Sequence, residues 1–225
     1  RFDYYDFEIE ALRPGNSGGD NDSLWQPKVS LAYSLNENFE LYANYGQGFH
    51  SNDVRVAVNT IDPATGDPSA SLDALVKGKG NEIGFRYDTL EGFNFTIARF
   101  ELDLDSELMF VGDAGTTEPS LPSRRDGIEL TSFWEINEPL AFDFSVSKTD
   151  GRYRGLPSGE NAIPDAHDLV AAAGLTYHVP NGWTTSLRVR HFSDSALTED
   201  ESVKKSSSTL IHFGVSYEQD SWELG

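Results

Sequence analysis

Acidic residues at alternate positions form the first group with chemical potential: Asp103, Asp105 and Glu107. Neighbouring carboxylates with separated pKa values can act as a general acid and a general base. In an extended strand, however, residues two apart point to the same side, where three carboxylates repel one another unless water or cations neutralise them. We therefore expect a structural charge ladder and no catalytic pair. The cations available for pairing are Arg99, Arg124 and Arg125.

Metal ligation is the second chemistry to consider. The histidines lack the spacing of a metalloprotease motif, so we expect no metal ligand among them. Gly19–Ser23 carries oxygen-bearing side chains at each position after the glycine, but an EF-hand calcium loop requires a longer spacing that ends in Glu. An Asx-rich turn explains this stretch better. The five histidines are His50, His167, His178, His191 and His212, of which His212 has the phase that points inward.

Composition and motifs exclude several further classes of function. The chain has no cysteine, which excludes disulfides and thiolate metal sites. The formal net charge of -20 argues against a nucleic-acid partner, because binding to phosphates requires Lys and Arg. The sequence has no P-loop and no dinucleotide fingerprint. We therefore expect no enzymatic activity and no cofactor.

The elements that carry these residues are strands with one apolar and one polar face. Leu140, Phe142, Phe144 and Val146 alternate with polar or small residues, and the same period of two runs from Thr209 to Tyr217. This period is typical of a strand whose two faces meet different surroundings. Strands are expected near 1–12, 25–35, 39–50, 79–89, 93–106, 124–136, 140–150, 166–178, 183–193 and 206–218, with another beginning at 221.

The connections between these strands alternate between short and long, as in an up-and-down barrel of the outer membrane. The short ones lie at 36–38, 90–92, 137–139, 179–182 and 218–221. The long ones lie at 13–24, 51–74, 107–123, 151–164 and 194–206.

A soluble β-sandwich shows the same alternation, so strand length and aromatic placement must separate the two folds. Sandwich strands commonly have about five or six residues, whereas these have about the ten that cross a hydrocarbon layer. Aromatic residues gather at the tight-turn ends, as in an interfacial girdle. We therefore expect an all-β fold, a partial antiparallel up-and-down transmembrane β-barrel. The girdle residues are Phe39, Tyr87, Phe93, Trp134, Tyr177, Trp183, Tyr217 and Trp222.

The polar face of such a barrel lines its interior. If Arg188 and Arg190 instead faced lipid near mid-membrane, each would cost about 2–4 kcal/mol, so the register is strongly specified. Gly46, Gly48 and Gly84 lie on the polar face, where we expect them to leave room for bulky neighbours. The candidates for contact with a solute or a plug are Tyr42, Asn44, Arg86, Glu129, Arg188, Arg190 and His212.

One strand breaks the alternation. Residues Phe93 to Ile97 place their aromatic and aliphatic side chains on one face, but beyond Arg99 the apolar phase moves to Phe100 and Leu102. A β-bulge near Ala98–Arg99 would shift the phase by one residue. The alternative is a strand that leaves the membrane and exchanges its surroundings.

Several segments resemble the C-terminal part of the barrel of TonB-dependent outer-membrane receptors. Residues 41–53 (LYANYGQGFHSND) resemble the family's LY-x-x-YG-x-GF-x-S strand and loop entry. Residues 75–86 (LVKGKGNEIGFR) resemble the following strand with its Glu-x-Gly core. The most specific match is 102–115 (LDLDSELMFVGDAG), which continues to 123–129 (SRRDGIE). The resemblance covers essentially the whole chain.

The resemblance implies a barrel of about 22 strands closed by an N-terminal plug, in the outer membrane of a Gram-negative bacterium. It implies uptake of a bulky, scarce solute, with a ferric siderophore as the leading expectation. It also implies two partners, outer-membrane lipid and the TonB complex, which would act through the plug.

Both ends of the chain fall inside strands, so we expect 1–225 to be a partial barrel domain with about 10 to 11 of the family's strands. We expect neither the plug nor the closing C-terminal strand within it. A plugless porin-like channel and a soluble β-rich binding or adhesion module are the alternatives.

Overall fold

The computed structural model describes residues 1–11, 16–51, 58, 60–61, 68, 74–106, 108–111, 116–119, 121–179, 181–219 and 222–224. The chain divides into two compact units, which are described separately. The first comprises Arg1–Val29, Tyr45–Gly80 and Leu102–Arg124. The second comprises Ser30–Asn44, Asn81–Glu101 and Arg125–Gly225.

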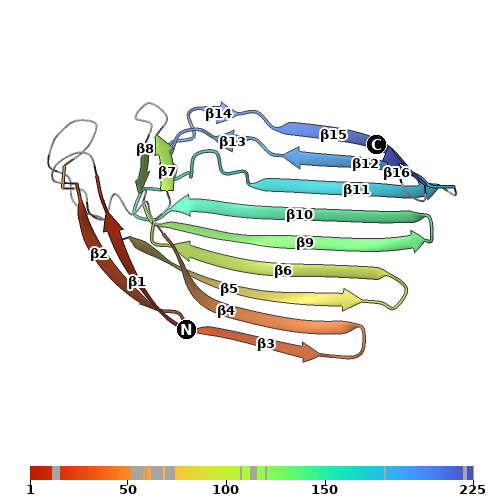
Figure 1. Cartoon of the computed structure of the whole chain (residues 1–225), viewed down its shortest axis with the longest axis horizontal. Coiled ribbons are helices and arrows are strands. Elements are labelled where there is room, and N and C mark those ends of the chain that lie inside the picture. Colours follow the sequence, from red (N-terminus) through yellow and green to blue (C-terminus); the bar gives the residue numbers. More distant parts are fainter. Residues whose placement is uncertain are drawn as a thin grey trace. The chain divides into compact units, whose positions relative to one another are not determined.

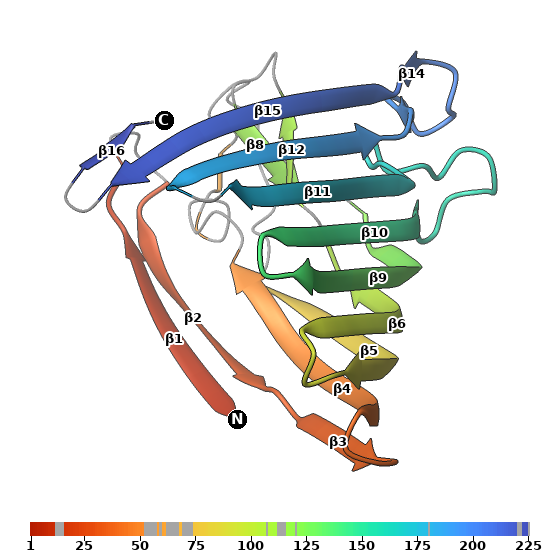
Figure 2. The same cartoon turned by 90° about the vertical axis from the view of Figure 1, so that its right-hand side faces the viewer.

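All strands of one ten-stranded sheet contribute residues to the second unit. Neighbouring strands follow one another in chain order, and their directions alternate (Figures 1 and 2). The observed order matches an up-and-down sheet, and β3 and β16 form its two edges. The strands are β3 (Lys28–Ser34), β4 (Phe39–Ser51), β5 (Leu75–Asp88), β6 (Phe93–Leu104), β9 (Ser123–Asn137), β10 (Leu140–Tyr153), β11 (Leu169–Val179), β12 (Trp183–Phe192), β15 (Ser208–Gln219) and β16 (Trp222–Leu224).

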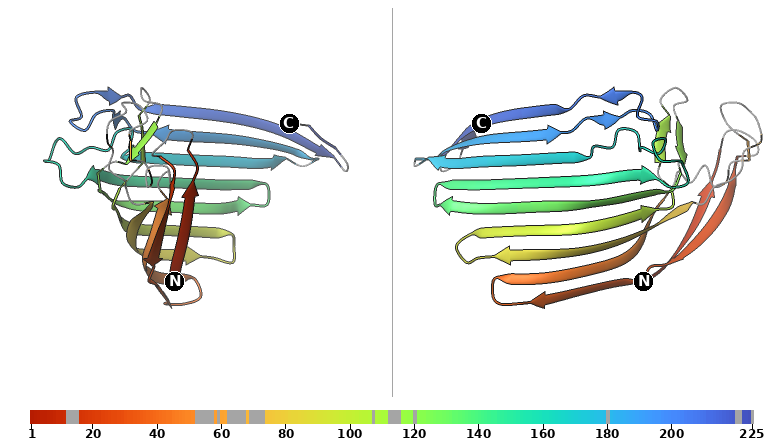
Figure 3. Two further views of the ribbon diagram at one scale, coloured as in Figure 1. Left: turned by 60° about the vertical axis from the view of Figure 1, so that its left-hand side comes forward. Right: turned by 180° about the vertical axis from the view of Figure 1, so that it is seen from behind.

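Tight turns connect these strands at one end of the second unit, and longer connections at 154–168 and 193–207 lie at the opposite end (Figure 3). The turn between β11 and β12 contains Asn181 with φ 77° and Gly182 with φ 87°. Two consecutive residues with positive φ are characteristic of a type I′ turn, which matches the right-handed twist of a hairpin. The alternation of short and long connections is confirmed for this unit.

The faces of the sheet differ as the alternation predicts. Large apolar side chains stay exposed on one face, among them Ile83 at 63%, Ile211 at 69% and Phe213 at 72%. A soluble sandwich would bury such residues between two layers. The described residues of the second unit include few buried apolar side chains, namely Ala98, Tyr153, Ala162 and Ile163. This distribution confirms the all-β fold of a partial, unclosed barrel and removes the two-layer alternative.

Aromatic rings meet one another near the tight turns. The Phe39 and Tyr87 ring centroids are 4.4 Å apart, and contacts continue from Tyr87 to Phe93 at 5.8 Å and from Phe93 to Trp134 at 6.1 Å. A second series joins Trp183, Tyr217 and Trp222 at 4.8 and 5.7 Å. The clustering that the sequence predicted is therefore confirmed for these residues.

The first unit contains two hairpins, of which the sequence predicted only the first strand, near 1–12. One pairs β1 (Phe2–Ile9) with β2 (Gly18–Trp25), and the other pairs β7 (Leu108–Val111) with β8 (Thr116–Pro119). Asn16 anchors the connection between β1 and β2: its side chain is 4% exposed, donates to the Ile61 carbonyl at 2.9 Å and accepts from the Thr60 and Ile61 amides.

The Asx-rich turn predicted for Gly19–Ser23 is wrong, because the whole stretch lies in β2. Its polar residues show no apolar alternation, although Asp20 and Asp22 do accept hydrogen bonds from the next backbone amides. The strand predicted at 25–35 is likewise interrupted, since β2 ends at Trp25 and β3 begins at Lys28. Pro27 lies between them; it lacks an amide hydrogen, and only its carbonyl joins the pairing, by accepting from Gln47 at 3.0 Å.

The β-bulge predicted near Ala98–Arg99 is also wrong. At the turn, Thr89 N donates to Phe93 O at 2.9 Å; at the far end, Asp105 N donates to Lys77 O at 3.0 Å. The chain advances by the same number of residues from Lys77 to Thr89 as from Phe93 to Asp105, so β6 contains no extra residue relative to β5. The apolar side chains therefore change face along a regular strand, as the alternative explanation required.

The described residues contain no helix that is long and apolar enough to cross a membrane.

Candidate functional site

The polar face of the sheet in the second unit carries all seven candidate residues. The alternation along each strand and the antiparallel register place them on this side. The register sets Arg188 directly opposite His212, and Arg190 between Ala172 and Leu210. The structure gathers the candidates into two groups, one on β4 and β5 and one on β10 to β15, and leaves others apart.

Tyr42 and Arg86 form the centre of the first group. The Arg86 guanidinium lies 4.8 Å from the centroid of the Tyr42 ring, a cation–π arrangement. Arg86 also forms an ion pair with Glu40 at 2.6 Å, and Glu82 lies near the Tyr42 hydroxyl. Arg86 is 51% exposed, so its ion pair with Glu40 contributes only modestly to stability. The contacts with Glu40 and Tyr42 nevertheless fix the position of Arg86 on the polar face of the sheet.

Gly84 allows this arrangement because the Tyr42 ring covers it. A Cβ atom at position 84 would collide with Tyr42 Cζ and with the phenolic oxygen. The expected room for a bulky neighbour is therefore confirmed at Gly84. Gly46 meets only Lys28 Cγ, at 3.7 Å, and Gly48 has nothing within 4 Å, so crowding does not explain those two glycines.

The second group is a row across β10, β11, β12 and β15. Asp143 and Arg188 form an ion pair at 3.1 Å across the intervening strand, above Gly174. A Cβ atom on Gly174 would lie 2.6 Å from Asp143 Oδ1 and 2.7 Å from Arg188 Nη1. The absence of a side chain there lets the two charges meet. His212 is exposed at the end of the same row.

The remaining candidates stand alone. Glu129 accepts a weak hydrogen bond from Ser147 at 3.4 Å. Within the described part of the chain, neither Asn44 nor Arg190 makes a side-chain hydrogen bond or an ion pair, and Arg190 is exposed. Sequence reasoning missed the acidic partners of the two arginines, Glu40 and Asp143. Their position on the polar face was visible in the alternation, but pairing them required the register.

A cavity of about 660 Å³ lies at the tight-turn end of this face. Carboxylates dominate its charged lining, and Arg188 and His178 are the basic groups. Its lining residues are Glu91, Phe133, Glu135, Ile136, Asn137, Glu138, Leu140, Ala141, Asp143, Thr176, His178 and Arg188.

Of the charge ladder predicted at Asp103, Asp105 and Glu107, the structure confirms the pairing of Asp103, which lies in the first unit. Asp103 is 3% exposed and accepts two hydrogen bonds from Arg124, at 2.8 and 3.0 Å, while Lys79 lies 3.4 Å away. Of the predicted partners, Arg124 is confirmed, whereas Arg99 makes no ion pair with a described residue. Glu107 lies outside the described residues. The described residues also contain no group of three or more acidic or histidine side chains suited to a metal.

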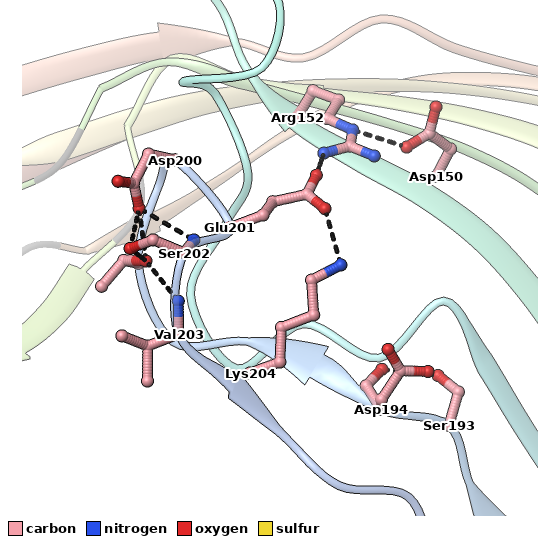
Figure 4. Close-up of polar contacts among 10 residues, drawn as sticks. Asp150, Arg152, Ser193, Asp194, Asp200, Glu201, Ser202, Val203 and Lys204 are labelled. Carbon is pink, nitrogen blue, oxygen red and sulfur yellow. Dashed lines mark hydrogen bonds and ion pairs between the residues drawn. The ribbon is translucent and has the colours of Figure 1, made fainter.

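The connection 193–207 is tied to the end of β10 and to the connection 154–168. Glu201 binds Arg152 at 2.6 Å and Lys204 at 3.0 Å, and Arg152 also binds Asp150 at 2.8 Å (Figure 4). Backbone bonds add to these ties: Ala162 N donates to Glu199 O at 3.1 Å, and Asp165 N to Ala196 O at 2.7 Å. The short strands β13 (Ser195–Ala196) and β14 (Lys204–Lys205) pair within the second connection. The result is one cross-braced platform, 154–168 with 193–207.

Electrostatics of the platform follow from these contacts. The hydroxyls of Thr198 and Ser202 donate to Asp200 at 2.6 and 2.7 Å and lower its pKa to about 2. Hydrogen bonds from Arg152 and Lys204 lower the pKa of Glu201. Both carboxylates are therefore charged at neutral pH, and each braces the platform in its ionised form.

Comparisons with known proteins agree with this architecture. The family model described as "TonB dependent receptor-like, beta-barrel" matches residues 1–225. Among solved structures, the chain resembles the ferric yersiniabactin uptake receptor FyuA of Yersinia pestis, with 16% identity and a TM-score of 0.68 over 90% of this chain and 31% of that one. It also resembles the ferric preacinetobactin receptor BauA of Acinetobacter baumannii, with 20% identity and a TM-score of 0.67 over 92% and 31%.

A third similar structure is the copper transporter OprC, with 18% identity and a TM-score of 0.70 over 92% of this chain and 33% of that one. The chain thus spans about a third of the length of these proteins. At these identities the likeness establishes the fold.

Proposed function

The chain belongs to the TonB-dependent receptor family, as a stretch of the β-barrel domain, and we propose that it forms part of an outer-membrane transporter for a bulky, scarce solute. Receptors of this family are outer-membrane β-barrels of Gram-negative bacteria. The observation that carries the proposal is the contrast between the two faces of one continuous sheet. Exposed Ile and Phe side chains cover one face, and paired or exposed charges cover the other.

The proposed solute is a ferric siderophore. Two of the similar structures are named as receptors for ferric complexes: FyuA for ferric yersiniabactin and BauA for ferric preacinetobactin. OprC is named as a copper transporter, so the metal and its chelator must be identified by experiment. Tyr42, Asn44, Arg86, Glu129, Arg188, Arg190 and His212 are the proposed contacts with solute or plug, because they share the polar face.

The proposed partners follow from membership of the family. The TonB complex would supply energy through a plug domain encoded outside residues 1–225, and further strands would complete the barrel. Outer-membrane lipid would contact the apolar face. No catalytic step is proposed, since the family and its solved neighbours are transporters and receptors.

The test is growth and uptake by a strain that produces the full-length receptor. We expect deletion of the gene to abolish growth on one ferric chelate from a panel, and complementation to restore it only when TonB is present. Uptake that persists without TonB would contradict the proposal. Steady ion conductance of the full-length protein in a planar bilayer would favour the porin-like alternative.

A further inference from the structure

Charge is divided unevenly over the polar face of the second unit. On β4, β5 and β9 the acidic residues Glu40, Glu82 and Glu129 outnumber the arginines Arg86 and Arg125, and Glu40 already neutralises Arg86 at 2.6 Å. On β12 and β15 the ionisable residues at mid-strand are basic. These are Arg188, Arg190 and His212.

Arg188 and Arg190 differ in what they already bind. Asp143 holds Arg188 at 3.1 Å, so this guanidinium is positioned and partly neutralised. Arg190 lies two residues further along β12, between Ala172 and Leu210, and neither neighbour is charged. Within the described residues it has no ion pair and no side-chain hydrogen bond. An exposed guanidinium without a carboxylate partner among the described residues is able to bind an anion through charge-assisted hydrogen bonds.

The three basic groups lie close enough to act on one ligand. Residues two apart on one face of a strand are separated by about 7 Å, and directly opposed residues by about 5 Å. Arg190 also lies two residues before β12 ends at Phe192, on the side of the long connection 193–207. A solute that enters from the loop end therefore meets Arg190 before it meets the Asp143–Arg188 pair.

We propose that Arg190, with Arg188 and His212 beside it, binds an anionic solute through exposed carboxylate groups. Guanidinium groups bind carboxylates through two parallel charge-assisted hydrogen bonds, which gives the site its selectivity for oxyanions. Asp143 competes with the solute for Arg188 and keeps that side chain directed across Gly174. The inference rests on the proposed transport function and specifies the chemical class of the solute.

The test measures binding of the citrate trianion to the full-length receptor by calorimetry, with the trication spermidine as the opposite-charge probe. We expect citrate to bind and spermidine not to compete with it. Arg190→Gln should weaken citrate binding at least about tenfold, because a charge-assisted hydrogen-bond pair is lost, and Arg190→Lys should restore part of it. Asp143→Asn should strengthen binding by releasing Arg188.

Arg99→Gln is the matched control, because Arg99 is an exposed arginine without an ion pair among the described residues and lies on the opposite, apolar face. It should leave citrate affinity unchanged. Resistance of the folded barrel to denaturation in unheated gel samples verifies that each variant is folded.

Failure of citrate to bind, or equal affinity in Arg190→Gln and Arg99→Gln, would overturn the inference. Loss of thermal stability in Arg190→Gln without a change in citrate affinity would assign Arg190 to the plug and would also overturn it. TonB-dependent uptake tests the proposed function independently. If uptake is TonB-dependent but citrate does not bind, only the anionic class of solute is rejected, and the proposed transport function stands.

Discussion

Replacing Phe213 with arginine tests which face of the sheet meets lipid. Phe213 is 72% exposed on the apolar face of β15. Tyr217 of the aromatic girdle lies four residues away, which at about 3.4 Å per residue and a tilt of about 40° corresponds to a height of about 10 Å. An apolar band about 25 Å tall therefore places Phe213 near its middle. Arginine there should cost about 2–4 kcal/mol.

His212→Arg is the control, because this neighbouring residue points to the polar face at nearly the same depth. Its cost should stay below about 1 kcal/mol, as for most exposed substitutions. The assay is urea-dependent folding of the full-length receptor into lipid vesicles, with the fraction folded read from gel mobility. If Phe213→Arg folded as well as His212→Arg, or better, the apolar face would be exposed to water and the reasoning refuted.

Three further predictions concern charged side chains and their partners. Gly174→Ala should separate Asp143 from Arg188, because the added Cβ would lie 2.6 Å from Asp143 Oδ1. The cost in stability should stay below about 1 kcal/mol. Calorimetry should show the same gain in citrate affinity as for Asp143→Asn, and an unchanged affinity would contradict this prediction. Arg124→Gln should destabilise the receptor by about 2 kcal/mol in urea unfolding, since it leaves the nearly buried Asp103 with Lys79 as its one cationic partner among the described residues. Adding Asp103→Asn to this variant should recover part of the lost stability. If the double variant were as unstable as Arg124→Gln, or less stable, the explanation would be refuted. Ordering of the 193–207 connection should decrease as pH falls from about 4 to about 2, because the folded pKa of Asp200 lies near 2, below its ordinary value of 3.8. Site-specific spin labels should report the change, and Asp200→Asn should reduce it while the contribution of Glu201 remains.

The sequence predicted the long regular strands because lipid and water on opposite faces impose a strict period of two. Thr209 to Tyr217 illustrates this, since each residue of that stretch of β15 has the orientation that the alternation indicates. The second strand of hairpin β1–β2 escaped prediction because Gly18 to Ser23 are polar or glycine, and no apolar face marks the strand.

Pairing across strands could not be read from one sequence. Asp143 and Arg188 are 45 residues apart, and only the register across β11 brings them together over Gly174. The pairing of Glu201 could not be read from the sequence either, because Arg152 lies in β10, 49 residues away. The β-bulge was inferred from a phase change in β6 that arises instead from residues changing surroundings along a regular strand.

Cysteine scanning along β15 tests the central claim most directly, and residues 1–225 contain no native cysteine to interfere. Single cysteines at 210, 211, 212 and 213 of the full-length receptor would each carry a bimane fluorophore in vesicles with brominated acyl chains. The account predicts strong quenching at 211 and 213 and little at 210 and 212. Equal quenching at all four positions, or the reverse alternation, would contradict it.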